Sequence, residues 1–339
     1  MKTWKNLMPL VAEMENLYNA FWKAKRGKEK KQEVQAYGDS LDENLYALSQ
    51  QLETGEVTAG DYRFFKIYDP KERMVCAAPF AQRVLHHALM NVCGPLLDKK
   101  QIFDSYACRR GKGQYAALER AQMFHAKYKW CLKLDIRKYF DSIDHDILKQ
   151  KLARTFSDCQ LLNVLFKIID SYESESGKGL PIGNLTSQYF ANHYLCALDH
   201  CLYERLHVAA YVRYMDDMLI WSDDREELLD KGKSVRSLLD GLHLKLKVFS
   251  LRRTAQTTEF LGYRLKGKGL LLSQRSMKRY SRRMVEAYRL YKCGFWDEEN
   301  LTAHIRPMTA FVMKADSYNF RKKTLAKLEK YEVDFPKGL

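Results

Sequence analysis

The segment that decides the fold is residues 209–221, which read AAYVRYMDDMLIW. Ala209–Tyr214 and Met218–Trp221 are predicted to form two short strands around a tight turn. The turn places Asp216 and Asp217 side by side, and adjacent carboxylates raise each other's pKa unless a cation neutralises them. Mg²⁺ binds to one or two such carboxylates, with water and phosphate oxygens as further ligands. The pattern indicates a divalent-metal hairpin, although an Asp-Asp pair alone is also typical of a solvated turn.

A third carboxylate is expected from the predicted strand Cys131–Ile136, near the end of which Asp135 stands. Three acids can hold two metal ions, an arrangement that activates a hydroxyl nucleophile and stabilises a leaving pyrophosphate. The candidate catalytic and metal-binding residues are therefore Asp135, Asp216 and Asp217. Two Mg²⁺ ions, with Mn²⁺ as a substitute, are the expected cofactor.

The remainder of the chain predicts an α+β protein whose two ends are mostly helical. An apolar stripe predicts one amphipathic helix over residues 3–22, which either packs on its own domain or docks a partner. Strands are expected at Phe64–Tyr68 and Thr258–Arg264. Further helices are expected at Gln82–Leu97, from Asp144 as the N-cap to Leu152, at Asp158–Ser171, Leu185–Leu206 and Ser222–Leu239, and beyond Gly269.

The charge of the chain indicates a polyanionic partner. It has 57 Lys and Arg against 42 Asp and Glu, a formal net charge of +15, and such an excess is typical of proteins that bind nucleic acid. Residues 264–339 carry 18 Lys and Arg against 8 Asp and Glu and so supply most of it. No apolar run approaches the roughly 18 residues of a membrane span, and no apolar signal region follows the N-terminus. We therefore expect a nucleic-acid partner, no membrane and a cytoplasmic location.

Two other features bear on metals and redox state. The eight cysteines are scattered without a CxxC pair, which favours reduced thiols over disulfides or a zinc ribbon. His193, Cys196 and His200 share one face of a predicted helix and could ligate a metal. The leucines around them follow the same helical spacing, so an ordinary packed helix is the favoured alternative.

Successive sequence blocks resemble those of bacterial reverse transcriptases and occur in the same order. They are YFDSIDH (139–145) after Asp135, the segment 180–188, the YMDD hairpin (214–217) and FLGY (260–263). The resemblance, which extends from about residue 66 to residue 263, implies a right-hand polymerase with fingers, a palm with an antiparallel sheet, and a helical thumb. We expect an N-terminal helical region (1–60), a fingers and palm domain (61–263) and a basic helical thumb (264–339).

The resemblance implies roles for further residues. Phe140 matches the aromatic that lies under the sugar, where a ring leaves no room for a 2′-hydroxyl. Its alternative role is in the core, because Tyr139 and Phe140 would face opposite ways on a strand. Either Lys245 or Lys247 could protonate the leaving pyrophosphate, or both are solvated. The expected nucleotide-binding residues are Lys66, Arg73, Phe140, Ile182 and Gln188, and the expected nucleic-acid-binding residues are Arg109, Arg110, Lys112, Arg279, Arg282 and Arg283.

The block PIGNLTSQ (181–188) discriminates between kinds of reverse transcriptase. Group II intron and retroviral enzymes generally have Gln where Ile182 stands, and Ser-Pro where Ser187-Gln188 stands. An apolar residue before Gly183, followed by Ser-Gln, resembles the enzymes of diversity-generating retroelements. That resemblance implies an RNA template repeat copied into cDNA with errors at adenines, and a small basic helical accessory protein as partner.

Three functions stay open at this point. The leading one is an RNA-directed DNA polymerase of a bacterial or phage-encoded retroelement, using an RNA template, a DNA or RNA primer and dNTPs. The second is a standalone or defence-associated bacterial reverse transcriptase. The third is a non-catalytic nucleic-acid-binding scaffold, against which the acid set and Phe140 argue, because binding alone needs neither.

Overall fold

The computed structural model describes residues 3–68 and 72–330. Its central sheet has four antiparallel strands in the order β4 (Tyr211–Tyr214), β5 (Asp217–Ser222), β3 (Trp130–Ile136) and β6 (Leu246–Arg253). On β5, Met218 and Ile220 enter one apolar core while Leu219 and Trp221 enter another, because successive strand residues point to opposite faces. The predicted hairpin is confirmed.

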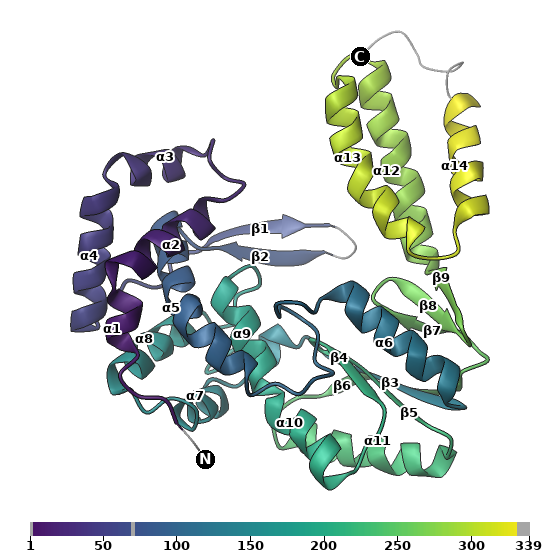
Figure 1. The fold of residues 1–339 in the computed structure, drawn as a ribbon, viewed down its shortest axis with the longest axis horizontal. Helices are drawn as coiled ribbons and strands as arrows, with labels where there is room; N and C mark the ends of the chain where they lie inside the picture. Colours follow the sequence, from purple (N-terminus) through teal and green to yellow (C-terminus); the bar gives the residue numbers. More distant parts are fainter. Residues whose placement is uncertain (1–2, 69–71, 331–339) are drawn as a thin grey trace.

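Helices cover both faces of this sheet (Figure 1). Helix α6 (Gln114–Lys127) packs on β4 and β5, and α11 (Arg225–Asp240) packs on the opposite face. At Gly232 of α11, an added Cβ would lie 2.7 Å from the side chains of both Leu132 and Phe249. Glycine therefore lets the helix approach the sheet closely.

An N-terminal lobe of helices carries a two-stranded hairpin toward the cleft (Figure 1). Its elements are α1 (Met8–Ala12), α2 (Met14–Lys25), α3 (Gln32–Asp39), α4 (Leu41–Thr54), β1 (Arg63–Ile67), β2 (Arg73–Ala77) and α5 (Phe80–Asp98). The prediction of one helix over residues 3–22 was wrong, because the chain turns at Glu13 with ψ 132°. The apolar stripe packs on its own lobe, since Val11 and Phe21 are buried in its core.

Two aspartates begin helices as predicted. Asp144 accepts a hydrogen bond from Ile147 N at the start of α7 (His145–Ala153), and Asp158 accepts one from Leu161 N at the start of α8 (Cys159–Asp170). The other carboxylate oxygen of Asp158, Oδ2, accepts from Leu7 N at 2.7 Å and from Met8 N at 3.0 Å. Burial acts to raise the pKa of Asp158, but these backbone donors lower it below its ordinary value. One acid therefore caps α8 and ties α1 to it.

The expected helix Leu185–Leu206 is interrupted. It forms α9 (Leu185–Tyr194), α10 (Cys196–His200) and one turn of π-helix, η2 (Cys201–Arg205), with a break at Leu195. The three candidate metal ligands have other partners: His193 bonds Thr155 Oγ1 and Lys151 O, Cys196 Sγ donates to Lys100 O, and His200 bonds Lys100 O and Glu204. In the described ranges no three His, Cys, Asp or Glu side chains lie close enough together to form a complete metal site as they stand. This segment is a packed helix, as the alternative prediction had it.

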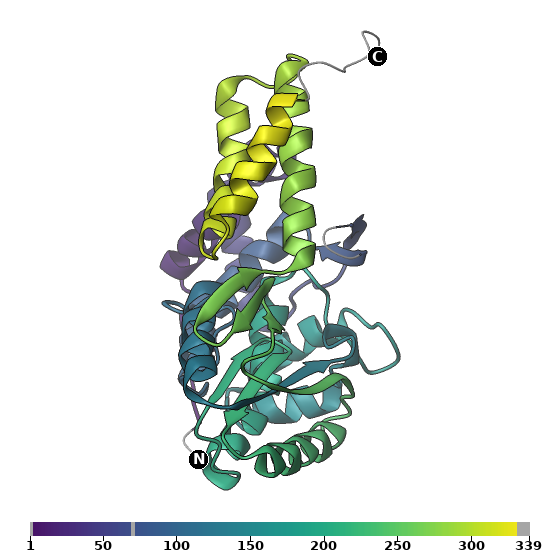
Figure 2. The same ribbon diagram turned by 90° about the vertical axis from the view of Figure 1, so that its right-hand side faces the viewer.

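Beyond the central sheet, a small three-stranded sheet leads into a helical lobe (Figure 2). The elements are β7 (Thr258–Phe260), β8 (Tyr263–Lys266), β9 (Gly269–Leu272), α12 (Gln274–Lys292), α13 (Glu298–Met313) and α14 (Tyr318–Lys330). The expected strand 258–264 is divided by a turn at Leu261 and Gly262, both with positive φ. The expected palm–thumb boundary at 263 falls inside this small sheet, and the three-part division of the chain stays a prediction.

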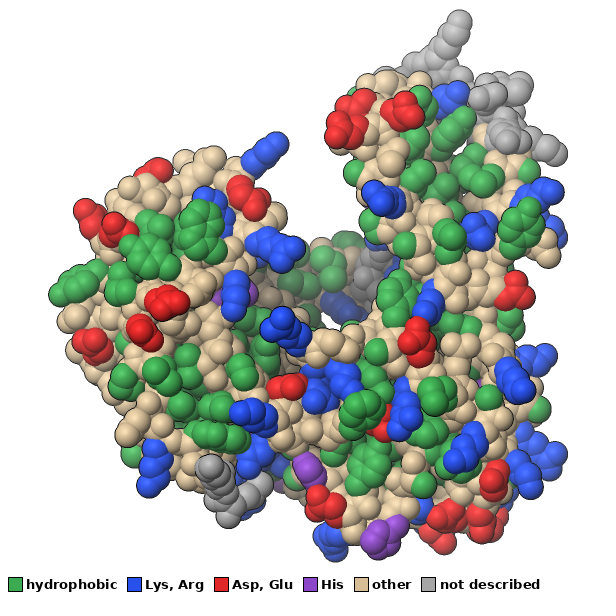
Figure 3. All heavy atoms as spheres, viewed as in Figure 1, with side chains coloured by type: hydrophobic (Ala, Val, Ile, Leu, Met, Phe, Trp, Pro, Cys, Tyr) green, Lys and Arg blue, Asp and Glu red, His purple; other side chains and the backbone are tan. Residues whose placement is uncertain are grey.

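The three lobes are arranged like a right hand around a cleft. A deep cleft separates the N-terminal lobe from the helical C-terminal lobe, and Lys and Arg side chains lie along its N-terminal wall and its floor (Figure 3). The predicted α+β, right-hand fold is confirmed. All eight cysteines are free, and no helix in the described part of the chain is long and apolar enough to span a bilayer.

Candidate active site

Three carboxylates meet at one end of the central sheet. Asp135 on β3 is the direct antiparallel partner of Asp217 on β5. Tyr214 pairs with Asp217 across the hairpin, so the turn consists of Met215 and Asp216 alone. Local hairpin geometry thus places one acid at the tip and one beside it, and the strand register brings the third.

Burial and the charges of the neighbouring carboxylates raise the pKa values of two of these acids. Burial, followed by the charge of Asp135, raises the pKa of Asp216 to about 6. Burial is also the main cause that raises the pKa of Asp217 to about 7, with Lys133 acting in the opposite direction. Oδ1 of Asp217 is buried and accepts no hydrogen bond, although Lys133 Nζ lies 3.3 Å from it as an ion-pair partner. A divalent cation would relieve both the repulsion and the unsatisfied oxygen.

Two lysines form ion pairs with these carboxylates and partly neutralise their negative charge. Lys133 Nζ lies 3.3 Å from Asp217 Oδ1 and donates to Glu259 O at 2.6 Å. Lys247 Nζ lies 3.6 Å from Asp135 Oδ2. The carboxylate set fits Mg²⁺ in ligand type, because Mg²⁺ prefers a few carboxylates together with water and phosphate oxygens.

The fingers hairpin brings one of its two candidate cations to the acids. Arg73 is close enough to Asp216 for its charge to lower the pKa of that carboxyl, against the larger effect of burial. Lys66 instead forms an ion pair with Glu72 on the same hairpin, at 2.7 Å. The structure therefore groups Arg73, but not Lys66, with the candidate metal ligands.

Tyr139 and Phe140 lie beyond the predicted strand Cys131–Ile136, which is confirmed, so strand alternation does not decide which way the two rings face. Strand β3 ends at Ile136, and Phe140 begins a short 3₁₀-helix, η1 (Phe140–Ser142). Tyr139 is buried and its hydroxyl donates to Ala191 O at 2.5 Å. Phe140 is half-buried against the same core. Tyr139 is thus the fully buried core aromatic, whereas the Phe140 ring is only partly covered, and its contact with a sugar stays a prediction.

The segment 181–188 holds the fingers hairpin against the palm. Ile182 O accepts from Cys76 N of β2 at 2.8 Å. Gly183 has φ +121°, and an added Cβ would lie 2.7 Å from Cys76 O, so only glycine fits between the two backbones. Cys108 Sγ donates to Gln188 Oε1 at 3.2 Å. Ile182 and Gln188 are therefore placed between fingers and palm.

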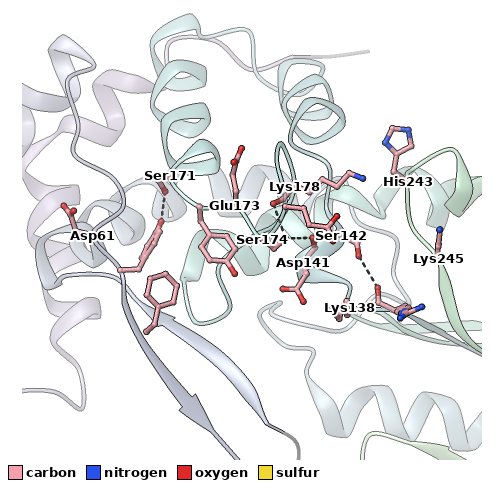
Figure 4. Close-up of a pocket in the computed structure, with 15 residues that line it drawn as sticks. Asp61, Lys138, Asp141, Ser142, Ser171, Glu173, Ser174, Lys178, His243 and Lys245 are labelled. Carbon is pink, nitrogen blue, oxygen red and sulfur yellow. Dashed lines mark hydrogen bonds between the residues drawn. The ribbon is translucent and has the colours of Figure 1, made fainter.

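A cavity of about 1010 Å³ opens past the ends of β3 and β6 (Figure 4). Its palm side carries Lys138 and Lys245, and Arg137 N donates to Lys245 O at 2.8 Å. Asp61 and Glu173 lie toward its other end (Figure 4). Lys245 thus faces this cavity, whereas Lys247 pairs with a candidate catalytic acid.

Comparison with known proteins decides the family. The profile described as "Reverse transcriptase (RNA-dependent DNA polymerase)" matches residues 68–265, more than half of the chain. The chain belongs to the reverse transcriptase family. A putative COX1/OXI3 intron 1 protein of Saccharomyces cerevisiae is 24% identical over 222 residues, which cover 61% of this chain and 24% of that protein. Protein YkfC of Escherichia coli is 23% identical over 177 residues, covering 47% and 46%. The chain thus spans half or less of the length of these relatives.

A structural match adds a further similarity. Telomerase from Candida albicans, solved with a fragment of telomeric RNA, matches this reverse transcriptase chain with a TM-score of 0.47 and 12% sequence identity. The match covers 84% of this chain and 57% of that one.

In this reverse transcriptase, hydrogen bonds to nearby residues stabilise the loop that carries Arg109, Arg110 and Lys112. Arg109 bonds Asp98, Ile102 O and Ser105 O, and its side chain is only 10% exposed. Lys112 donates to Phe103 O and lies over the ring of Phe103. Arg110 is exposed. Of the three predicted nucleic-acid contacts, Arg110 is the one whose position suits a phosphate contact, whereas Arg109 shapes the loop.

The three thumb arginines lie on α12. Arg282 is exposed, while Arg279 and Arg283 line a small groove with Phe311, and the guanidinium of Arg279 lies over that ring. Sequence reasoning did not single out Lys133, which pairs with Asp217, or the buried ion pair of Asp199 and Arg213. Lys133 stands two residues before Asp135 on β3, so both side chains point to the same face of the sheet. This spacing could have predicted that Lys133 lies near the acids. The other two have no local signal, because only the tertiary fold buries them.

Proposed function

We propose that this chain is an RNA-directed DNA polymerase that makes cDNA by two-metal nucleotidyl transfer. The observation that carries the proposal is the convergence of Asp135, Asp216 and Asp217 at one end of the palm sheet. These residues would hold two divalent ions, Mg²⁺ or Mn²⁺, which supply charge neutralisation for the reacting phosphates. Non-catalytic binding would not require such mutually repelling acids.

The surrounding side chains suit the proposed chemistry. The planar guanidinium of Arg73 would orient the triphosphate, and the Phe140 ring would exclude a 2′-hydroxyl by its bulk. Lys247, beside Asp135, would give a proton to the leaving pyrophosphate. Lys66 would reach the triphosphate only after leaving Glu72. Gln188 and Ile182, between fingers and palm, would contact the nascent pair.

We further propose that the enzyme serves a diversity-generating retroelement, which is supported by PIGNLTSQ at 181–188. It would then copy an RNA template repeat from a DNA or RNA primer with adenine errors, together with a small basic helical accessory protein. Primer extension on RNA with Mg²⁺ and dNTPs tests the polymerase. An error spectrum concentrated at template adenines would support the retroelement assignment. An even spectrum or untemplated synthesis would favour a standalone or defence-associated reverse transcriptase.

Ile182 is the proposed determinant of adenine errors. A glutamine at this position offers hydrogen bonds near the nascent pair, whereas isoleucine offers only shape. One hydrogen bond is worth about 1 kcal/mol and at most about 1.5 kcal/mol, which corresponds to about fivefold to tenfold in discrimination. We expect Ile182→Gln to lower misincorporation opposite adenine by up to about tenfold, with cytosine as the internal control. An active Ile182→Gln enzyme with an unchanged adenine error rate would place the determinant elsewhere.

The thumb arginines should contribute to non-specific duplex affinity. We expect heteroduplex affinity to fall steeply with salt, because each neutralised phosphate releases counterions. Replacing Arg279, Arg282 and Arg283 with alanine should flatten the log–log salt slope by about one unit per lost contact. Alanine replacement of Lys231 and Lys233 on α11, outside the cleft, should leave the slope unchanged. An unchanged slope in the thumb variant would mean that this cluster does not contact phosphates.

A further inference from the structure

A buried ion pair lies directly beneath the acid hairpin. Arg213 on β4 and Asp199 on α10 both have fully buried side chains, 0% exposed. Arg213 Nη2 lies 2.5 Å from Asp199 Oδ2, and Nε lies 2.8 Å from Oδ1. Tyr211 OH donates to the same Oδ1 at 2.9 Å. An apolar pair of equal volume is often at least as stable as a buried ion pair, so stability alone does not account for this arrangement.

The guanidinium also reaches three segments besides Asp199. Nη1 donates to Asn192 Oδ1 on α9 and to Met215 O in the turn, both at 3.1 Å. Nη2 donates to Gln101 Oε1, after α5, at 3.1 Å. Arginine presents its donors in a rigid planar fork. These contacts therefore fix the turn relative to two helices and the segment that follows α5.

The contact to Met215 O acts on the peptide that carries the metal-binding acid. Met215 has φ +57°, a left-handed conformation that is disfavoured for a bulky side chain. Its carbonyl belongs to the peptide bond that leads into Asp216. Because the turn contains only these two residues, fixing that carbonyl fixes the direction in which the Asp216 carboxylate leaves the backbone.

The backbone of Arg213 also forms hydrogen bonds with the segment that precedes the loop of Arg109, Arg110 and Lys112. Arg213 N donates to Asp104 O and Arg213 O accepts from Tyr106 N, both at 3.0 Å. Asn192 Nδ2 donates to Ala107 O at 2.6 Å. The segment 104–107, which leads to Arg110, is therefore held to the strand that carries the hairpin.

We propose that Arg213 is a positioning residue for the metal-binding hairpin: anchored on Asp199, it fixes the Met215–Asp216 peptide and thereby aims the Asp216 carboxylate. The inference rests on the proposed polymerase function, but it makes a separate statement about the protein without nucleic acid. Arg213 itself touches neither substrate nor metal. Its effect should appear in the turn, in metal affinity and in the rate of chemistry, with little effect on nucleotide binding.

Arg213→Lys tests the proposal, because lysine keeps the charge that Asp199 requires but lacks the planar fork that reaches the turn. Arg213→Gln combined with Asp199→Asn is the second variant; it removes both charges together and leaves no unpaired ion, in case the first does not fold. Trp221→Phe is the matched control. It removes a buried hydrogen bond to His125 at the far end of the same hairpin.

Three measurements separate positioning from general destabilisation. In either variant, hydrogen exchange in a peptide spanning residues 214–217 should be about tenfold faster or more, and Mn²⁺ alone should bind more weakly. The single-turnover rate should fall by about 10²-fold, the loss typical of a misplaced reacting group, while the KM for dNTP changes by less than about threefold. Trp221→Phe should change none of these at temperatures where it is folded.

The outcomes distinguish the two proposals. Wild-type exchange at the turn and a wild-type rate in both folded variants would overturn the role of Arg213, as would equal losses in Trp221→Phe. If the wild-type protein extends no primer but the variants still exchange faster and bind Mn²⁺ more weakly, the polymerase proposal fails and the positioning role stands.

Discussion

Asp216→Asn protein is expected to lose Mg²⁺-dependent primer extension by several orders of magnitude in rate, and Asp135→Asn should behave alike. The structure supplies the reason. Asp216 forms the hairpin tip, and the charge of Asp135 contributes to its raised pKa, so the two carboxylates share one electrostatic environment. An amide in place of either acid keeps the shape but removes the charge that would hold a cation. The loss should appear in the rate at saturating dNTP.

The control separates catalysis from binding. RNA binding by Asp216→Asn should survive, because nucleic-acid affinity depends on the basic surfaces and not on the acids. Asp240→Asn, at the exposed end of α11, makes the same chemical change away from the site and should extend primers at the wild-type rate. Extension by purified Asp216→Asn protein at a rate near wild type would refute the assignment of this acid.

The local part of the site could be predicted from the sequence. Strand alternation and a two-residue turn are encoded within residues 209–221. In an antiparallel sheet, the register restricts the positions that a carboxylate near the end of a neighbouring strand can occupy. The helix caps Asp144 and Asp158 are likewise local signals. Such features need only the chain within a few residues, so the sequence pattern determines them.

The features that depend on the tertiary fold could not be predicted. Arg213 and Asp199 appear in the sequence as ordinary charged residues of a strand and a helix, and only packing shows that both are buried together. In the sequence, Arg109 is indistinguishable from an exposed cation. In the structure, its side chain donates to the backbone carbonyls of Ile102 and Ser105. The helix breaks at Glu13 and Leu195 have no signal in the apolar periodicity from which the two longer helices were predicted.

Lys247→Met is expected to slow nucleotide incorporation by about 10²- to 10⁴-fold, the range for loss of a general acid. The sequence left Lys245 and Lys247 equivalent, and the structure separates them. Lys247 Nζ lies 3.6 Å from Asp135 Oδ2, whereas Lys245 lines the neighbouring cavity. In the proposed mechanism, a lysine beside a candidate metal ligand would be near the position where the pyrophosphate leaves. The measurement is the single-turnover rate at saturating dNTP across a range of pH.

Lys245→Met is the matched control, with the same change of charge and shape two residues away. It should retain the wild-type chemical rate and, at most, raise the KM for dNTP. In the wild-type enzyme the rate should fall on the alkaline side as the acid loses its proton, and in Lys247→Met this alkaline fall should be absent. If Lys245→Met instead carries the rate loss while Lys247→Met stays within about threefold of wild type, the proton comes from the cavity side and the assignment reverses.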